Sequence, residues 1–184
     1  MLIDITLNVT PEMMNNASNN LHKALVGHIG THFDVMDKEF PLNYTKCDGI
    51  VFDISNIGDR DVLVSDIDVD RVSKGMFVLF YSGFIENEEY GSKNYFLNHP
   101  QLSNELIDNL VEKGISLIGI DFAGIRRGRE HTPKDQYCAD NGVFIIENLC
   151  NLDKLLECAR FYVNTYPMKF SGVTGLPCRV IAEV

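Results

Sequence analysis

The stretch over residues 27–37, GHIGTHFDVMD, holds the side chains best suited to chemistry. In it, His28, His32 and Asp34 stand at even spacings, with Gly30 between the histidines. Two imidazoles and a carboxylate suit zinc, and they also suit manganese or iron. Three protein ligands leave positions open for water and substrate, and such a site brings the pKa of bound water towards about 7. The pattern therefore indicates a divalent metal centre that supplies hydroxide at neutral pH.

The spacing favours an extended backbone here. On a helix, His28 and His32 would share a face, but Asp34 would be turned about 240° from His28. Gly30 would also weaken that helix by roughly 1 kcal/mol. On a strand all four residues project to one side, and Gly30 leaves a gap in which an ion would sit. The alternative is a structural role, which is the usual role of a single histidine in a strand. Burying three such groups without an ion would be costly, however.

Composition excludes several other classes. The chain has 184 residues, with 26 acidic and 16 basic side chains and a net charge of −10. Its hydrophobic fraction of 45% is typical of a folded protein, and we expect one domain over residues 1–184. The acidic balance disfavours nucleic acid and anionic membranes as partners. The sequence shows neither a membrane span nor a signal peptide, so we expect a cytoplasmic protein that acts on a small molecule.

The other histidines and the cysteines show no comparable pattern. We expect His22 and His99 to be structural. The cysteines are odd in number and lack CxxC spacing, which indicates reduced, packed thiols. A cysteine nucleophile remains an open alternative. The five cysteines are Cys47, Cys138, Cys150, Cys158 and Cys178.

The hydrophobic pattern supplies the elements that would position these groups. It predicts helices over 103–113, 132–141 and 151–160, the first with an N-cap serine. The predicted strands cover 1–7, 49–54, 75–81, 115–121, 143–147, 163–170 and 179–184. The result is an α/β or α+β protein with a β-rich N-terminal half and βα units in the C-terminal half.

The segment HIGTHFD resembles the first part of the motif H-x-G-T-H-x-D-x-P-x-H of the metal-dependent cyclase/hydrolase family, which includes kynurenine formamidases and isatin hydrolases. Further blocks resemble those of the family in the same order, so the resemblance covers nearly the whole chain. These blocks are GIVFDIS (49–55), GMFVLFYSG (75–83), GISLIGID (114–121), IIENLCNL (145–152) and GLPCRVIA (175–182).

This resemblance implies a swivelling β/β/α fold and a metal-dependent hydrolase of a non-peptide C–N bond, in a formamide or a small cyclic amide. Zinc is the first expectation for the metal and manganese the second. A homo-oligomer, dimer or tetramer, is expected on family grounds alone.

The family's site residues transfer position by position. His28, His32 and Asp34 match its first three metal ligands. Glu147 matches a glutamate that ligates metal in the two-zinc members, and a carboxylate at the end of a strand could do so physically. The alternative for Glu147 is a cap or loop charge.

Two departures lie at the end of the motif, and the second concerns proton transfer. The motif's proline is Met36 here, and its final histidine, the proton shuttle of the formamidases, is Lys38. A lysine moves protons only if burial or nearby cations lower its pKa from about 10.4. Lys38, Asp37 or His131 would have to replace the shuttle, and Glu147 could support the ion or handle a proton.

A third departure concerns the second metal. The family's later ligand histidine falls on Asp135, with Gln136 beside it. Both remain candidate ligands, but the TPKD of residues 132–135 also fits a capping box in which Asp135 only accepts backbone N–H groups. A single-metal site is therefore favoured.

Arg126, Arg127 and Arg129 form a basic cluster in this acidic chain. The first two are candidates to clamp an anionic substrate, because guanidinium binds carboxylates bidentately. The alternative is a solvated loop paired with surface acids.

Two other functions stay open. A family member that lost the shuttle could bind a metal or a small molecule without hydrolysing it. A lyase or dehydratase could use the same metal.

Overall fold

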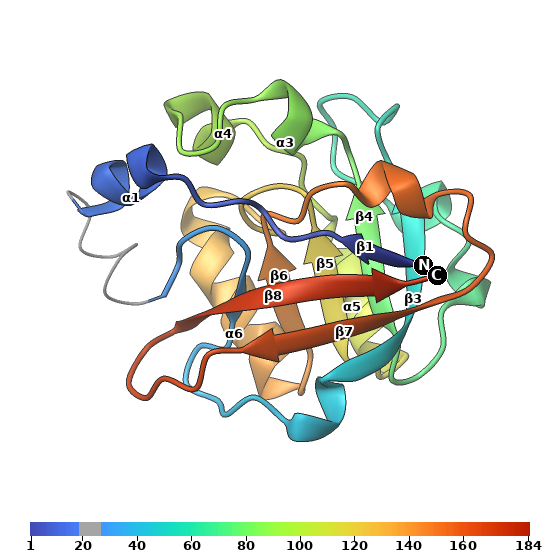
Figure 1. Ribbon diagram of the computed structural model, residues 1–184. Helices are drawn as coiled ribbons and strands as arrows, with labels where there is room; N and C mark the ends of the chain where they lie inside the picture. The colour runs from blue at the N-terminus through green and yellow to red at the C-terminus, as the bar shows by residue number, and fades with distance from the viewer. Residues whose placement is uncertain (19–26) are drawn as a thin grey trace.

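The computed structural model describes residues 1–18 and 27–184. In this part of the chain the strands form one mixed sheet in the order β1-β8-β2-β6-β5-β4-β3-β7. Because β7 also pairs with β8, the seven strands from β2 to β8 close into a barrel-like sheet, and β1 adds to the edge of β8 (Figure 1). The strands are β1 (Leu2–Asp4), β2 (His32–Asp34), β3 (Lys46–Asp53), β4 (Phe77–Tyr81), β5 (Leu117–Ile120), β6 (Phe144–Glu147), β7 (Phe161–Pro167) and β8 (Gly175–Glu183).

The four strands β3, β4, β5 and β6 run parallel. All residues of β5 and β6 and all but the last of β4 are buried, as expected for strands with both faces covered, and these strands are therefore mainly apolar. In β4, Phe77 and Leu79 belong to a cluster that also takes residues from β1, β2, β7 and β8, which places it inside the barrel. Val78 and Phe80 belong to a second cluster with Leu106 and other residues of α5 (Asn104–Glu112), on the outer face.

The helices lie outside the sheet (Figure 1). α5 begins after Ser103, whose side chain accepts a hydrogen bond from the Leu106 N–H, as the sequence predicts. α6 (His131–Asp140) covers the region near the predicted metal ligands. The shorter helices are α1 (Pro11–Ser18), α3 (Phe84–Asn87) and α4 (Lys93–Leu97), and none of the described helices has the length and apolar character needed to cross a membrane.

The structure confirms the mixed α and β class and most of the predicted elements. The helix predicted over 151–160 is wrong, because only the single 3-10 turn Leu152–Leu155 forms there. Leu152 and Leu155 are both fully buried, and their spacing of three residues is satisfied by that one turn. Asn151 has a φ of 56° instead of the extended backbone of an N-cap residue.

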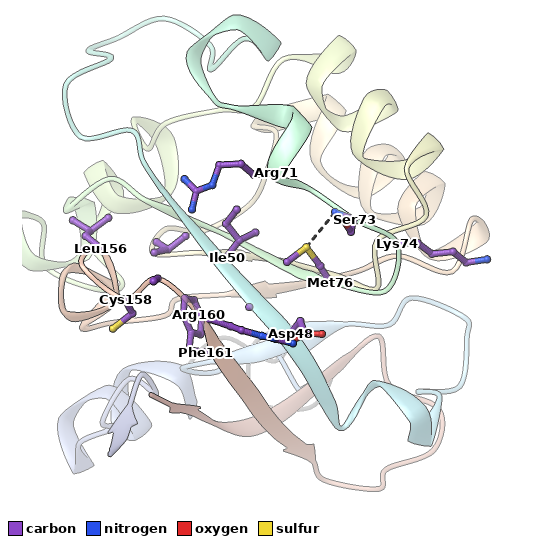
Figure 2. A pocket seen from close by; sticks show the side chains of 13 residues that line it. Asp48, Ile50, Arg71, Ser73, Lys74, Met76, Leu156, Cys158, Arg160 and Phe161 are labelled. Carbon is purple, nitrogen blue, oxygen red and sulfur yellow. Dashed lines mark hydrogen bonds and ion pairs between the residues drawn. The ribbon is translucent and has the colours of Figure 1, made fainter.

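A pocket of about 380 Å³ lies beside β3 (Figure 2). Ile50 and Phe161 form apolar parts of its lining, and Arg71 and Arg160 bring positive charge. None of the predicted site residues lines it, so this pocket is separate from the metal centre described below.

Leu79 allows a test of the barrel interior. Its side chain is fully buried, so Leu79→Ala should lower the free energy of unfolding by about 2–5 kcal/mol. Leu97→Ala is the control, because Leu97 is 54% exposed. Urea unfolding of both variants measures the difference, and equal losses would contradict the assignment of Leu79 to the core.

Candidate metal centre

β2 carries the centre of the site. It lies between β6 and β8 and is antiparallel to both, with His32 opposite Glu147. Phe33 points into the barrel, so His32 and Asp34 project together to the outer face. All three polar side chains are buried, with His32 at 2%, Asp34 at 1% and Glu147 at 4% exposure. The prediction of an extended backbone is confirmed for residues 32–34.

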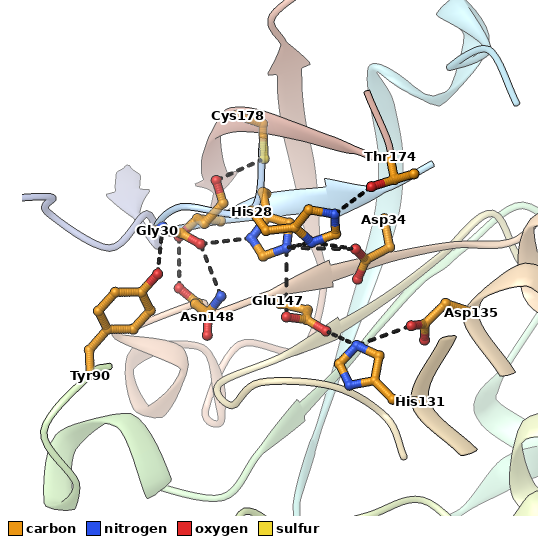
Figure 3. A network of polar contacts seen from close by, with 12 residues as sticks. His28, Gly30, Asp34, Tyr90, His131, Asp135, Glu147, Asn148, Thr174 and Cys178 are labelled. Carbon is orange, nitrogen blue, oxygen red and sulfur yellow. Dashed lines mark hydrogen bonds and ion pairs between the residues drawn. The ribbon is translucent and has the colours of Figure 1, made fainter. Parts of the chain in front are cut away.

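His28 reaches the same place through a turn instead of a strand. Gly30 has a φ of 62°, and a Cβ there would lie 2.5 Å from Val9 Cγ2, so Gly30 makes the turn and is not part of an extended strand with His32 and Asp34. As a result, His28 Nδ1 lies 3.0 Å from His32 Nε2 and 3.2 Å from Asp34 Oδ1. Figure 3 shows the His28 ring beside Asp34. On its other side, His28 Nε2 lies 2.8 Å from Thr174 Oγ1.

α6 adds two more groups from its first turns. His131 Nε2 lies 3.1 Å from Asp135 Oδ2 and 3.4 Å from Glu147 Oε1. Residues four apart share a helix face, which explains why both side chains point the same way. The capping-box alternative for Asp135 is wrong, because the helix begins at His131 after an N-cap at Glu130, and Asp135 is a buried residue inside it.

The carboxyl groups perturb one another strongly. Burial raises the pKa of Glu147 well above its ordinary value, and the charges of Asp34 and Asp135 raise it further. Burial also raises the pKa of Asp135, to about 6, against the opposing contact with His131. Burial acts in the same direction on Asp34, but its contacts with His28 and His32 outweigh it and hold the pKa of that carboxyl far below its usual range.

These residues fit a divalent cation. Three carboxylate oxygens, Asp34 Oδ2, Asp135 Oδ1 and Glu147 Oε1, are buried without a hydrogen-bond partner among the described residues. Potential ligand atoms converge within 4.8 Å in two groups that share Asp34. In the first group, the closest atoms of His28, His32 and Asp34 are 3.0, 3.2 and 3.6 Å apart. Ligands about 2.0–2.1 Å from a tetrahedral zinc lie roughly 3.3 Å apart, so the spacing matches. The two groups are His28–His32–Asp34 and Asp34–His131–Asp135.

Lys38 and Gln136 do not join this cluster. Lys38 Nζ lies 2.7 Å from Asp140 Oδ1 and 3.1 Å from Asp37 Oδ1, and these two contacts raise the pKa of Lys38. A shuttle needs a lowered pKa, so the structure contradicts that role. Gln136 Nε2 donates to Asp37 Oδ1 at 2.7 Å and to Asp140 Oδ1 at 3.0 Å, which places it in this surface network and away from the metal ligands.

The arginines also lie in other contacts. Arg126 is 9% exposed and donates to Asp61, Glu130 and the Leu102 carbonyl. Its guanidinium is therefore occupied by contacts within the protein that fix the 126–130 segment. This contradicts the prediction that Arg126 clamps a substrate. The Arg127 side chain donates to the Leu97 carbonyl at 2.9 Å.

His99 has the structural role predicted for it, whereas His22 lies outside the described residues. The His99 ring stacks on Phe122, with centroids 5.6 Å apart, and Nδ1 lies 2.7 Å from the Pro100 carbonyl oxygen. Burial lowers its pKa to about 4.

Three of the cysteines are poorly suited to act as nucleophiles. All five are free, and burial raises the pKa of Cys138 and of Cys178 to about 12 and that of Cys150 to about 11. Thiolate is the reactive form, so these pKa shifts oppose nucleophilic catalysis.

Four site residues were not identified from the sequence: Tyr90, Tyr95, Asn148 and Thr174. Asn148 directly follows Glu147, so its position was a usable signal. The two tyrosines and Thr174 come from loops and a short helix whose approach to residues 28–32 no local pattern indicates.

Comparison with known proteins agrees with this site. The Cyclase family model, described as putative cyclase, matches residues 3–126. The chain therefore belongs to the Cyclase family. The match includes His28, His32 and Asp34 and ends before α6. A search of curated proteins gives no match.

Solved structures share the fold over nearly their whole length. A potential metal-dependent hydrolase with cyclase activity is 25% identical, with a TM-score of 0.75 and coverage of 99% of this chain and 98% of that one. A predicted metal-dependent hydrolase from Bacillus stearothermophilus is 23% identical, with a TM-score of 0.74 and coverage of 99% and 97%. Isatin hydrolase A from Labrenzia aggregata, bound to benzyl benzoate, is 20% identical, with a TM-score of 0.76 and coverage of 100% and 93%. The first of these similarities supports an enzyme, and all three support the fold.

Removing one imidazole tests the centre. His32→Ala should abolish stoichiometric metal binding, because the ring lies between His28, Asp34 and Glu147. Elemental analysis of the purified protein gives the metal content. Lys38→Met is the control and should keep its metal, since Lys38 pairs only with Asp37 and Asp140 among the described residues. Full metal content in His32→Ala would rule out this assignment.

His99 gives a prediction for stability against pH. Its folded pKa of about 4 lies below the unfolded value of about 6.5, so its contribution is complete above pH 6.5 and is lost as the pH falls towards 4. Wild type should lose about 2 kcal/mol more than His99→Gln between pH 7 and pH 5. Urea unfolding at both pH values measures this, and parallel losses would show that His99 is not buried in its neutral form.

Proposed function

We propose that the protein hydrolyses a non-peptide C–N bond, in a formamide or a small cyclic amide, with a divalent ion held by His28, His32 and Asp34. The observation that supports this best is the convergence of His28 Nδ1 with His32 Nε2 and Asp34 Oδ1, of which the last two belong to buried side chains. Zinc is the first choice and manganese the second, because both accept imidazole and carboxylate ligands. Similarity to the potential metal-dependent hydrolase with cyclase activity is consistent with this reaction class.

A bound divalent ion would lower the pKa of a coordinated water and polarise the carbonyl of the substrate. The chain's own residues provide the rest. His32, Asp34 and Glu147 are buried, whereas the side chains of His28 and His131 are 27% and 32% exposed. Substrate therefore approaches from the side of these two rings.

His131 is better placed for proton transfer than Lys38, whose ion pairs with Asp37 and Asp140 raise its pKa. Its Nε2 faces both Asp135 Oδ2 and Glu147 Oε1, so the ring can accept a proton at that atom and release it to the leaving nitrogen. Asp135 orients the ring from the same helix face, and Glu147 supports the ion or shares the proton.

The second candidate is a family member that binds a metal or small molecule without hydrolysing it. The ion pairs of Lys38 favour this alternative, because they raise the pKa of the lysine that stands where the family motif has a histidine, so it does not readily exchange its proton. A lyase or dehydratase on the same ion is a third candidate and would be recognised by its product.

Several finer features also remain proposals. The free cysteines support a cytoplasmic location, and the likeness to the solved structures supports the swivelling β/β/α description. A homo-oligomer and an anionic substrate are expectations from the resemblance and from Arg127.

Assays of the metal-loaded protein test the reaction. Zinc- or manganese-loaded protein should hydrolyse at least one member of a panel of formamides and small cyclic amides, and chelation should remove the activity. His131→Ala should lower kcat by about 10²–10⁴-fold, as expected for the loss of a general acid–base group, while keeping the ion. Lys38→Met should behave like wild type.

The outcomes separate the three candidates. Metal binding without turnover of formamides, cyclic amides, esters or lactones would favour the binding protein. Loss of water from a hydroxy acid would favour the dehydratase. A His131→Ala variant with full kcat would remove His131 from the mechanism.

A further inference from the structure

The orientation of His32 depends on one backbone carbonyl. His32 Nδ1 lies 2.9 Å from the Gly30 oxygen. A carbonyl oxygen can only accept, so Nδ1 carries the hydrogen of the neutral ring. The lone pair is then on Nε2, the atom that faces His28, Asp34 and Glu147. The Gly30 carbonyl thus selects the tautomer of His32 that can bind a metal.

The Asn148 side chain holds that carbonyl in place (Figure 3). Its Nδ2 donates to the Gly30 oxygen at 2.9 Å, and the acceptor-only chemistry of the carbonyl fixes which end of the amide faces it. The Tyr95 hydroxyl donates to Asn148 Oδ1 at 2.7 Å. Tyr95 is fully buried, and burial raises its pKa, so the hydroxyl keeps its proton. Asn148 is itself only 2% exposed.

The backbone of Asn148 is equally constrained. Its φ is 59°, in the left-handed region that asparagine tolerates better than most residues with a side chain. Its N–H donates to the Phe122 carbonyl at 3.2 Å, and its carbonyl accepts from Thr31 Oγ1 at 2.7 Å. Because it follows Glu147 directly, this turn ties the end of β6 to the residues flanking Gly30. A second contact, from the Gly30 N–H to the Tyr90 hydroxyl at 2.8 Å, supports the same turn.

We infer that Asn148 is a positioning residue for the metal centre, whose amide holds the Gly30 carbonyl and through it fixes the direction and tautomer of His32. Tyr95 acts behind it by holding the amide. This inference rests on the proposed function in that it needs the ion to bind at His32. Second-layer partners of this kind typically change metal affinity by about 10–100-fold.

The chain offers a matched pair of variants. Asn148→Gly removes the amide but keeps a residue that accepts a positive φ. Asn151→Gly is the control, because Asn151 also has a positive φ, of 56°. Its Nδ2 donates to the Asp4 carbonyl at 3.0 Å and not to the Gly30 carbonyl. We expect zinc binding, measured by competition with a chelator, to weaken by about 10–100-fold in Asn148→Gly and to stay within about twofold in Asn151→Gly.

A second readout needs no metal. Nitrogen-15 NMR of the metal-free protein distinguishes the two neutral tautomers of His32. Wild type should show the Nδ1–H form, and Asn148→Gly should show a mixture. If Asn148→Gly fails to fold, Tyr95→Phe takes its place, with a smaller loss of zinc affinity in the same direction.

The results separate this inference from the proposed function. Wild-type zinc affinity in Asn148→Gly, or an equal loss in Asn151→Gly, would overturn the positioning role while leaving the metal centre intact. For the replacement variant, unchanged affinity and an unchanged tautomer would do the same. Wild-type protein that binds no zinc but holds His32 as the Nδ1–H form would overturn the proposed function and keep the positioning of the ring.

Discussion

The cost of burying three carboxyl groups side by side dominates this structure. Asp34, Asp135 and Glu147 are each less than 5% exposed, and each leaves one oxygen without a hydrogen bond among the described residues. Histidines offset part of this cost, as the low pKa of Asp34 shows, but the raised pKa values of Glu147 and Asp135 show that they do not offset all of it. A divalent cation would supply the missing positive charge. The burial of these carboxyl groups is therefore understandable if the fold leaves space for such a cation between them.

The shortest central strand of the barrel-like sheet, β2, positions His32 and Asp34 in this cluster of buried carboxyl groups and histidines. β2 has only three residues, yet it pairs on both sides, so neither edge is free to shift its register. A slip of one residue would turn His32 and Asp34 into the apolar interior and bring Phe33 out. The apolar core and the metal site therefore specify the same register.

A local sequence pattern predicts elements with a periodic arrangement of side chains and contacts between neighbouring residues. This explains which parts of the fold and the site could be predicted from the sequence. The parallel strands, α5 with its Ser103 cap and the face shared by His32 and Asp34 all follow from spacing within one segment. The turn at Gly30 depends on the approach of Val9, and the contacts of Asn148 with Tyr95 come from another part of the chain, so no local rule reaches them. Lys38 and Arg126 each pair with one acid close in sequence, Asp37 or Glu130, but their second acidic partners, Asp140 and Asp61, are distant in sequence, and no local rule predicts those contacts.

The departures from the family motif make sense together in three dimensions. The resemblance aligns a ligand histidine of the family with position 135, where this chain has Asp135. This chain instead carries a histidine, His131, one helical turn earlier. Because residues four apart share a helix face, His131 projects beside Asp135 and meets Glu147 Oε1 from α6. The site thus keeps an imidazole near Glu147 while gaining a carboxylate, and the surplus of acid beside the first three ligands increases. That surplus strengthens the case for a cation, and it places the partly exposed ring of His131, rather than the ion-paired Lys38, next to the buried carboxylates.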